Sequence, residues 1–344
     1  MLKWILCETL TRTGLLRLLE SKTQRSARIL VFHRVRPTRV EDGMTVSESV
    51  FEAQLQFLRE RYHLVSLDEV SAMVRGACPM RPGTVAITFD DGYADNYTRA
   101  WPVLVRHKVP VTIFLAVGAV DADAPLWTEQ LRHAVWASPS QSVDLAAFGW
   151  ERWPLRTQAQ RWACLQVVKS RLKAMADGKR KQALHGILQA LEWEGQEKGI
   201  NQMLTWDMVR EMQKADVTIG AHTISHKILT RLDPTEAEWE IAQSKRRIEE
   251  QLGEPVRHFA FPNGTRADWN PDIQEIVRQC GFETACTTVR GTNPVGHDPY
   301  ALRRLEITDA GCTDPFGRFS TAMFATQLAG VFGGWEQECQ RSCA

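Results

Sequence analysis

The sequence predicts an α/β fold in which parallel strands form a closed or nearly closed barrel. Short runs rich in β-branched residues alternate with amphipathic stretches along most of the chain, a pattern typical of strand–helix units around a parallel sheet. Residues 111–117 are almost entirely apolar, as expected for a strand that is buried on both faces. About eight such units fit a barrel better than an open sheet, which the pattern also allows.

The strands and helices of this barrel are assigned in chain order from their hydrophobic patterns. Strands are expected at residues 28–33, 63–67, 85–89, 109–117, 217–221, 256–261, 284–289 and 302–307. Helices are expected at residues 51–62, 67–75, 96–107, 206–215, 235–252 and 271–280. Gly76, Gly253 and Gly281 stand where three of these helices should end. Chemistry in such a barrel belongs on the loops that leave the carboxyl ends of the strands.

Residues 28–310 are predicted to form the barrel, and a helical insertion interrupts it at about residues 121–202. The insertion lacks a convincing strand pattern, and residues 158–176 and 179–194 are expected to be helical. It holds six of the chain's twelve tryptophans, which should form a local core or line a lid over a substrate. The last segment, residues 311–344, is expected to be a C-terminal tail.

Charge and composition exclude several classes of protein. The 344 residues include 42 Lys+Arg and 41 Asp+Glu, a balance that a dedicated nucleic-acid binder would not have. No apolar stretch reaches the length of about 18 residues that crosses a membrane.

The N-terminal segment, residues 1–27, is basic and amphipathic. Glu8 and Arg12 interrupt its apolar residues, so it does not resemble a cleavable secretory signal. Two roles fit it: packing on the body with a solvated basic face, or peripheral contact of residues 1–26 with an anionic membrane surface. Without an export signal, the protein is expected in the cytoplasm, where its eight cysteines would stay reduced.

Two adjacent carboxylates, Asp90 and Asp91, directly follow the expected strand at residues 85–89. Neighbouring carboxylates repel each other when both are ionised. A cation bound by one of them would relieve this repulsion and leave the other free to act as a base. Taken alone, the segment also fits an ordinary Asp-Gly turn.

Two histidines, His222 and His226, directly follow the expected strand at residues 217–221. Histidines four residues apart share one face of a helical turn, so both imidazoles can reach one cation. Together with Asp91 they would form a set of two imidazoles and one carboxylate, which is usual for catalytic zinc. Co²⁺ and Fe²⁺ accept the same set, so the ligand types favour Zn²⁺ without excluding the other two ions.

Three segments together resemble the signature motifs of the polysaccharide deacetylase family, whose members are metal-dependent carbohydrate esterases with a NodB-like homology domain (carbohydrate esterase family 4). They are TFDDGY at residues 88–93, HTISH at residues 222–226 and FAFPNG at residues 259–264. The resemblance runs from about residue 29 to residue 307 and omits the insertion. It implies a distorted (β/α) barrel of the NodB-like deacetylase type with a helical insertion.

The resemblance also implies a hydrolase that removes N-acetyl groups from an amino sugar in a polysaccharide, an oligosaccharide or a lipid-linked glycan precursor. Asp90 would be the general base that takes a proton from the attacking water. Asp91, His222 and His226 would hold the divalent metal ion. The backbone N–H of Asn263, in the third motif, would help to hold the oxyanion that forms.

Four further residues complete the expected site. Thr223 and Ser225 should brace the histidine loop through hydrogen bonds. Tyr93, at the end of the first motif, and Arg304 are expected to contact the substrate.

The chain departs from the family pattern in two places. The third motif lacks the Arg that commonly stands two residues before its proline, and it continues Pro-Asn where Pro-Tyr is common. The late Leu-His motif that usually supplies the general acid is missing. Some family members carry the acid histidine on the first strand, and His33, at the end of the expected strand 28–33, fits that arrangement. His33 is therefore the expected general acid, the alternative being a core histidine bonded to a backbone carbonyl.

Three other functions stay open from the sequence. Non-haem Fe(II) oxygenases share the ligand types, although they usually fold as antiparallel jelly rolls. A related hydrolase could remove a formyl or an O-acetyl group from a sugar. A non-catalytic carbohydrate-binding relative would be expected to lack the base or a metal ligand, and none of these residues is missing here.

Overall fold

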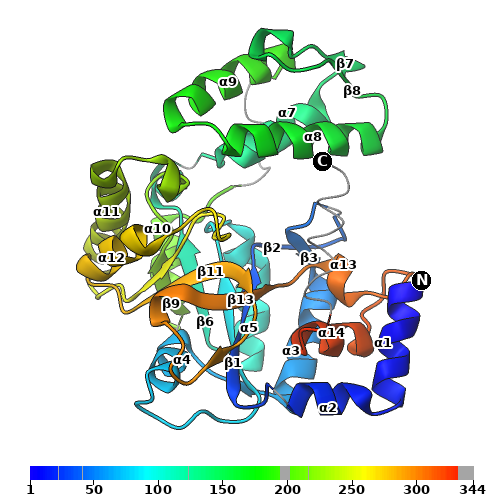
Figure 1. Cartoon of the computed structure of the whole chain (residues 1–344), viewed down its shortest axis with the longest axis vertical. Helices are drawn as coiled ribbons and strands as arrows, with labels where there is room; N and C mark the ends of the chain where they lie inside the picture. Colours follow the sequence, from blue (N-terminus) through cyan, green and yellow to red (C-terminus); the bar gives the residue numbers. More distant parts are fainter. Residues whose placement is uncertain (22, 41, 123, 194–201, 216, 332–344) are drawn as a thin grey trace.

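Parallel strands close into a barrel in the computed structural model, which describes all residues except 22, 41, 123, 194–201, 216 and 332–344 (Figure 1). The ring contains β1 (Ser26–Phe32), β5 (Thr84–Phe89), β6 (Val111–Leu115), β9 (Val217–Ala221), β10 (His258–Ala260), β11 (Thr284–Arg290) and β13 (Leu302–Glu306), in that order. It closes because β1 pairs in parallel with β5 on one side and with β13 on the other. The predicted (β/α) barrel is confirmed.

The ring has seven strands, fewer than the expected eight units. The difference is the expected strand at residues 63–67, which forms only the two-residue strand β4 (His63–Leu64). This strand pairs with Thr84 and Val85 at the start of β5, and β6 takes the same side of β5 from Ile87 onward. The backbone groups that would admit β4 into the ring are therefore already used.

Helices cover the outside of the ring, and local sequence explains where most of them begin. They are α3 (Glu48–Arg61), α4 (Leu67–Val74), η1 (Asn96–Ala100), α5 (Trp101–His107), α10 (Trp206–Gln213), α11 (Pro234–Leu252) and α12 (Pro271–Gln279). Asp233 and Asn270 cap the first turns of α11 and α12 with their side chains, and each is followed by a proline, which needs no hydrogen-bond acceptor there. Gly253 ends α11 with a positive φ of 71°, as the sequence predicts.

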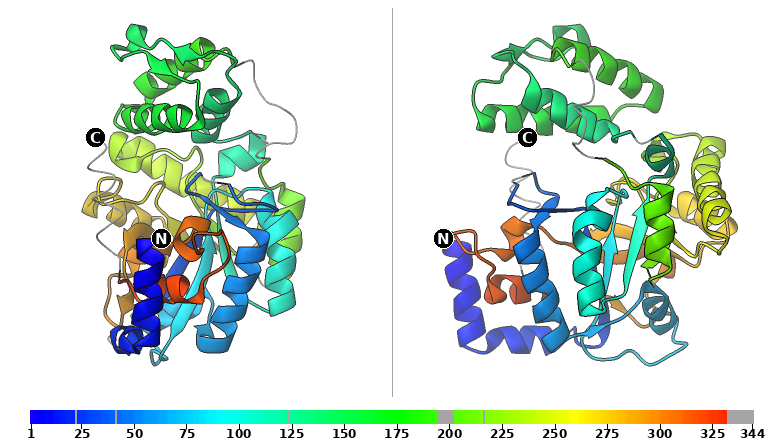
Figure 2. Two further views of the ribbon diagram at one scale, coloured as in Figure 1. Left: turned by 90° about the vertical axis from the view of Figure 1, so that its right-hand side faces the viewer. Right: turned by 180° about the vertical axis from the view of Figure 1, so that it is seen from behind.

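The insertion stands as a separate layer beyond the carboxyl ends of the barrel strands (Figures 1 and 2). It contains α7 (Trp127–Ala137), α8 (Gln158–Lys173) and α9 (Asp177–Ala190), preceded by α6 (Val117–Ala122) and joined by a short hairpin of β7 (Ser142–Val143) and β8 (Trp153–Pro154). The hairpin was not expected. Apolar side chains give the insertion a core of its own: Leu131, Val135, Leu165, Val168, Leu172 and Ile187, with Trp127, Trp150, Trp153, Trp162 and Trp193 packed against it.

One buried and one partly buried ion pair connect the insertion to the barrel. Arg34, on β2 (Arg34–Arg36), lies 2.7 Å from the carboxylate of Glu129 on α7. Lys227, directly after the second histidine of the motif, lies 3.3 Å from Asp177 at the start of α9. Strand β2 pairs with β3 (Thr45–Ser47) in a separate two-stranded sheet at the same end of the molecule. The insertion is therefore held directly above the end of the barrel where the motifs lie.

The two ends of the described chain pack against each other. Helices α1 (Leu2–Arg12) and α2 (Leu15–Ser21) form the N-terminal segment, and the buried Cys7 of α1 contacts Ala322 and Met323 of α14 (Thr321–Leu328). Residues 309–312 form the short helix α13 (Asp309–Cys312), so much of the expected C-terminal tail is packed structure, while residues 332–344 lie outside the described residues. Within the described part of the chain, no helix is long and apolar enough to cross a membrane.

Candidate metal centre and active site

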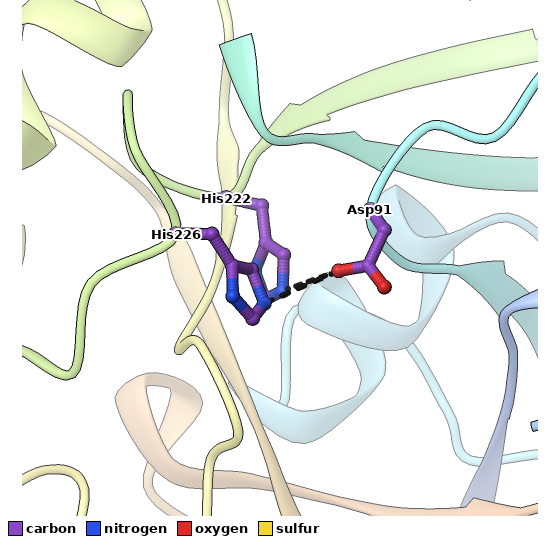
Figure 3. A group of neighbouring side chains, drawn as sticks. All are labelled: Asp91, His222 and His226. Carbon is purple, nitrogen blue, oxygen red and sulfur yellow. Dashed lines mark ion pairs between the residues drawn. The ribbon is translucent and has the colours of Figure 1, made fainter. Parts of the chain in front are cut away.

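Asp91, His222 and His226 meet at the carboxyl ends of β5 and β9 (Figure 3). Their ligand atoms all lie within 4.8 Å of one another, and all three residues are buried. The Oδ1 atom of Asp91 is 3.5 Å from Nε2 of His222 and 3.2 Å from Nε2 of His226. Tetrahedral ligands about 2.0–2.2 Å from one Zn²⁺ ion would lie roughly 3.3 Å apart, so the observed spacing fits a single ion.

The hydrogen-bonding state of the trio also fits a cation. Nδ1 of His222 lies 2.7 Å from the carbonyl oxygen of Ala260, to which it can donate, and this leaves Nε2 with a free lone pair. Burial lowers the pKa of His222 to about 4, which favours the neutral form that binds metals. Oδ1 of Asp91 is buried without a hydrogen-bond partner among the described residues. A cation would satisfy this oxygen, which otherwise carries an uncompensated cost.

Backbone strain is concentrated in the same three motifs. Six described residues other than glycine have a positive φ, and four of them belong to the motifs: Asp91 at 76°, Thr223 at 65°, His226 at 52° and Asn263 at 58°. Such conformations cost on the order of 1–3 kcal/mol each and persist only where the surrounding structure enforces them. The rigid strand ends therefore hold these residues in a fixed arrangement.

Asp90 does not join the trio but pairs with Arg304 from β13. The pair is bidentate, with distances of 2.7 and 2.6 Å between the guanidinium nitrogens and the two carboxylate oxygens. Burial by itself would raise the pKa of Asp90, but the charge of Arg304, with smaller contributions from His222 and His33, outweighs it and keeps the pKa below its ordinary value. Asp90 is therefore ionised, as a base must be.

Arg304 is fully buried. Its Nε donates a hydrogen bond to the carbonyl oxygen of Thr287 at 2.8 Å, and another nitrogen contacts the Thr88 hydroxyl at 3.2 Å. Every direct contact of the guanidinium is thus within the barrel. A contact between Arg304 and the substrate stays a prediction, and the contacts that the structure shows are those that orient Asp90.

Tyr93 is also fully buried, with its ring centroid 4.5 Å from the guanidinium of Arg34. Its hydroxyl has no hydrogen-bond partner among the described residues. A contact between Tyr93 and the substrate stays a prediction.

His33 and Asn263 lie beside the trio on two other strand ends. His33 directly follows β1 and is half-buried, and its charge acts on both Asp90 and Asp91. Its backbone carbonyl accepts a hydrogen bond of 2.9 Å from the side chain of Asn96. Asn263 follows β10 and is also half-buried. The structure therefore brings both residues to the mouth of the barrel, while their catalytic roles stay predictions.

Glu240 is a residue of the site that the sequence analysis missed. It is fully buried on α11, where its carboxylate accepts hydrogen bonds from the backbone N–H groups of Ile224 at 3.0 Å and Ser225 at 2.9 Å, and from the hydroxyl of Ser225. The ammonium of Lys227 lies 3.4 Å away. Ser225 thus braces the histidine loop as predicted, whereas the hydroxyl of Thr223 has no partner among the described residues.

One signal in the sequence could have identified Glu240. It stands on the same helical face as Ala237, Ile241 and Ser244, all of which are buried. A carboxylate on an otherwise buried face needs a partner, because burying an unpaired charge is costly.

Comparison with known proteins agrees with the fold. A barrel with two histidines and a carboxylate at its carboxyl end offers a ligand set that suits one divalent ion. The family model for polysaccharide deacetylases matches residues 78–285, which is more than half of the chain, and the chain belongs to this family.

Relatives and solved structures support the same assignment. YxkH of Bacillus subtilis (strain 168) is 21% identical over 305 residues, which cover 88% of this chain and 79% of that protein. The poly-beta-1,6-N-acetyl-D-glucosamine N-deacetylase of Escherichia coli (strain K12) is 37% identical over 83 residues, which cover 24% of this chain and 12% of that protein.

Two solved structures share the fold. IcaB from Ammonifex degensii is 20% identical, with a TM-score of 0.56 over 89% of this chain and 97% of that one. The Streptococcus pyogenes deacetylase PplD, in complex with acetate, is 18% identical, with a TM-score of 0.55 over 82% of this chain and 92% of that one. The jelly roll on which the oxygenase alternative depended is not the fold of this chain.

Proposed function

We propose that the protein is a metal-dependent hydrolase that removes N-acetyl groups from an amino sugar in a glycan or a glycan precursor. The observation that carries the proposal is the trio of Asp91, His222 and His226 next to an ionised Asp90 that Arg304 holds in place. A metal trio supplies a site for one ion, and a separate carboxylate beside it supplies the base that a hydrolase needs.

Each residue has one task in the proposed reaction. When bound to the trio, a divalent ion, with Zn²⁺ the first candidate and Co²⁺ or Fe²⁺ the alternatives, would lower the pKa of water and polarise the acetyl carbonyl. Asp90 accepts the proton of the attacking water. The backbone N–H of Asn263 donates to the oxygen that becomes negatively charged. His33 gives a proton to the departing nitrogen, because an amide anion is a very poor leaving group.

The relatives guide the choice of substrate. The Escherichia coli relative is named as an N-deacetylase of poly-β-1,6-N-acetyl-D-glucosamine, so oligomers of N-acetylglucosamine are the first substrates to test. Removal of a formyl or an O-acetyl group remains the nearest alternative. A purely carbohydrate-binding role is disfavoured, since the base and all three metal ligands are present.

Acetate release tests the proposal directly. Purified protein loaded with Zn²⁺, Co²⁺ or Fe²⁺ should release acetate from N-acetylglucosamine oligomers, lose this activity after chelation and regain it when the metal is restored. Formylated and O-acetylated oligomers run in parallel decide between the acyl groups. No acetate release from any N-acetylated oligomer by metal-loaded protein, or undiminished activity in metal-free protein, would overturn the proposal.

The proposed cytoplasmic enzyme would also contact an anionic membrane surface through α1 and α2. Their apolar side chains are unusually exposed: Leu2 by 79%, Leu18 by 61%, Ile5 by 47%, Leu15 by 46% and Leu6 by 43%. Basic residues flank them, namely Lys3, Arg12, Arg17 and Arg25. Apolar residues bordered by positive charge are typical of helices that lie on anionic lipid surfaces.

Liposome sedimentation tests this contact without removing the helices, whose buried faces pack on the body. The triple variant Leu2→Ser/Ile5→Ser/Leu18→Ser should lose most of the binding to anionic vesicles. A matched control, Val105→Ser/Val295→Ser/Phe316→Ser, removes exposed apolar residues elsewhere and should bind like the wild type. Equal binding by wild type and triple variant would contradict the membrane contact.

A further inference from the structure

Helix α8 lies on the side of the insertion that faces the barrel and carries Lys169 and Lys173 one helical turn apart (Figures 1 and 2). Side chains at this spacing lie next to each other, roughly 5–6 Å apart at their Cβ atoms. Both lysines are half-buried. Within the described part of the chain, neither makes an ion pair or a hydrogen bond, and charged side chains in this position usually have a partner.

Carboxylates at the mouth of the barrel act on the charge of both lysines. Burial, together with the charge of Lys169, lowers the pKa of Lys173 to about 8. The carboxylates that act in the opposite direction are Asp268, Asp91 and Glu306. They belong to the loop after β10, the loop after β5 and the end of β13, so all three lie at the carboxyl ends of the strands.

Three of the acidic residues nearby are already engaged with other groups, whereas Glu306, which also acts on both lysines, is exposed to solvent. Glu129, which acts on Lys169, is paired with Arg34 at 2.7 Å. Asp42, which also acts on Lys169, accepts a hydrogen bond of 2.8 Å from the hydroxyl of Thr45. Asp268 accepts hydrogen bonds from the backbone and side chain of Thr265. These acids reduce the free-energy cost of burying two ammonium groups, but both ammonium groups can still bind a further anion.

We propose that Lys169 and Lys173 bind an anionic group of the substrate, a phosphate or a carboxylate that lies close to the N-acetylated sugar. The inference rests on the proposed function for its choice of sugar, and it assigns to the insertion the selection of charged over neutral glycans. Two adjacent ammonium groups suit a phosphate or carboxylate, because each can donate to a different oxygen of the same anion. A bound anion would also offset the burial that lowers the pKa values of both lysines.

The test compares three N-acetylglucosamine disaccharides that differ in one group: a neutral one, one with a phosphate monoester at the reducing end, and one whose reducing end is oxidised to a carboxylate. Affinities for the full-length protein are measured by titration calorimetry. The double variant Lys169→Gln/Lys173→Gln removes the proposed site. The control Lys108→Gln/Lys214→Gln removes the same charge from exposed positions that precede β6 and β9, at the opposite end of the barrel.

The wild type should bind at least one anionic disaccharide roughly 10- to 100-fold more tightly than the neutral one, the usual worth of one or two charge-assisted contacts. Lys169→Gln/Lys173→Gln should abolish this preference and leave affinity for the neutral disaccharide unchanged, while the control keeps the preference. The anionic disaccharide whose affinity falls more in the double variant shows whether the lysines bind phosphate or carboxylate. A direct contact between the anion and a bound metal would affect wild type and variant equally, so the difference between them reports on the lysines.

Equal affinity of the wild type for all three disaccharides, or an equal loss in both double variants, would overturn the proposal. Acetate release from the same disaccharides is recorded separately, so that the two claims can fail independently. Preferential binding without acetate release would refute the deacetylase function and keep the anion site. Acetate release without preferential binding of an anionic disaccharide would refute the anion site and keep the deacetylase function.

Discussion

The barrel and the insertion differ in whether their charged side chains have partners. At the mouth of the barrel, Asp90 is fixed by Arg304, and Asp91 faces two imidazoles with which it can share a cation. On α8 of the insertion, Lys169 and Lys173 carry charge with no ion-pair partner in the part of the chain that the structure describes.

This difference follows from how each region is built. The strand ends of a closed barrel are fixed by backbone pairing on both sides, which allows strained and buried groups to be held in register. The insertion is a small helical layer with its own core, tied to the barrel by ion pairs such as Arg34 with Glu129. A rigid region suits the reaction, and an added layer above it suits the selection of substrates.

The largest effect is expected from the metal ligands. His222→Ala removes one of three ligands, so metal content and acetate release should both fall to background. His185→Ala, an exposed histidine on α9 of the insertion, provides the matched control and should leave both unchanged. Normal metal content in His222→Ala would show that the trio is not the metal site.

Loss of the proposed general acid should have the next largest effect. His33→Ala should reduce acetate release from an N-acetylated sugar by roughly 10²–10⁴-fold, the usual contribution of general acid–base catalysis. An activated acetyl ester needs no proton on its leaving group and should lose much less. Equal losses on both substrates would make His33 structural.

The Asp90–Arg304 pair should control stability as well as activity. Arg304→Met leaves the Asp90 carboxylate buried without its partner, which should cost about 3–5 kcal/mol of unfolding free energy. Thermal or urea unfolding measures this loss. Arg171→Met breaks an exposed pair with Glu151 in the insertion and should shift the unfolding midpoint little. Comparable shifts in the two variants would show that the buried pair is not a special support of the site.

The smallest of these effects concerns the link between the two regions. Burial raises the pKa of Glu129, but Arg34 and Arg132 outweigh it, so the pKa lies below its ordinary value. A carboxylate with a lowered pKa stabilises the fold above its unfolded pKa of about 4.3 and loses this contribution as the pH falls through its folded pKa. Glu129→Gln should therefore cost about 3 kcal/mol near neutral pH and progressively less in acid. A stability difference that does not change with pH would contradict this assignment.

Much of the barrel could be predicted from the sequence, because each strand and its outgoing motif are local features. The apolar run at residues 111–117 and the carboxylates after residues 85–89 can each be recognised from a few consecutive residues. The expected strand at residues 63–67 failed because ring closure, a long-range property, left it almost no backbone to pair with.

The parts that could not be predicted depend on contacts between distant segments. Arg304 reaches Asp90 across 214 positions of sequence only because β13 and β5 flank the same strand. The orientation of Lys169 toward the barrel depends on how the insertion docks, which no local pattern encodes. Glu240 could be predicted in part: its position on a buried helical face follows from the sequence, whereas its hydrogen-bond partners depend on distant contacts.

Metal content of two neighbouring variants tests the central claim most directly, because the account gives adjacent aspartates different tasks. Asp91→Asn should leave the purified protein without metal, whereas Asp90→Asn should retain about one ion per chain and lose roughly 10²–10⁴-fold in acetate release. Elemental analysis of both variants beside the wild type provides the measurement. Loss of metal from Asp90→Asn as complete as from Asp91→Asn, or retention by both, would contradict the assignment of base and ligand on which the proposed reaction depends.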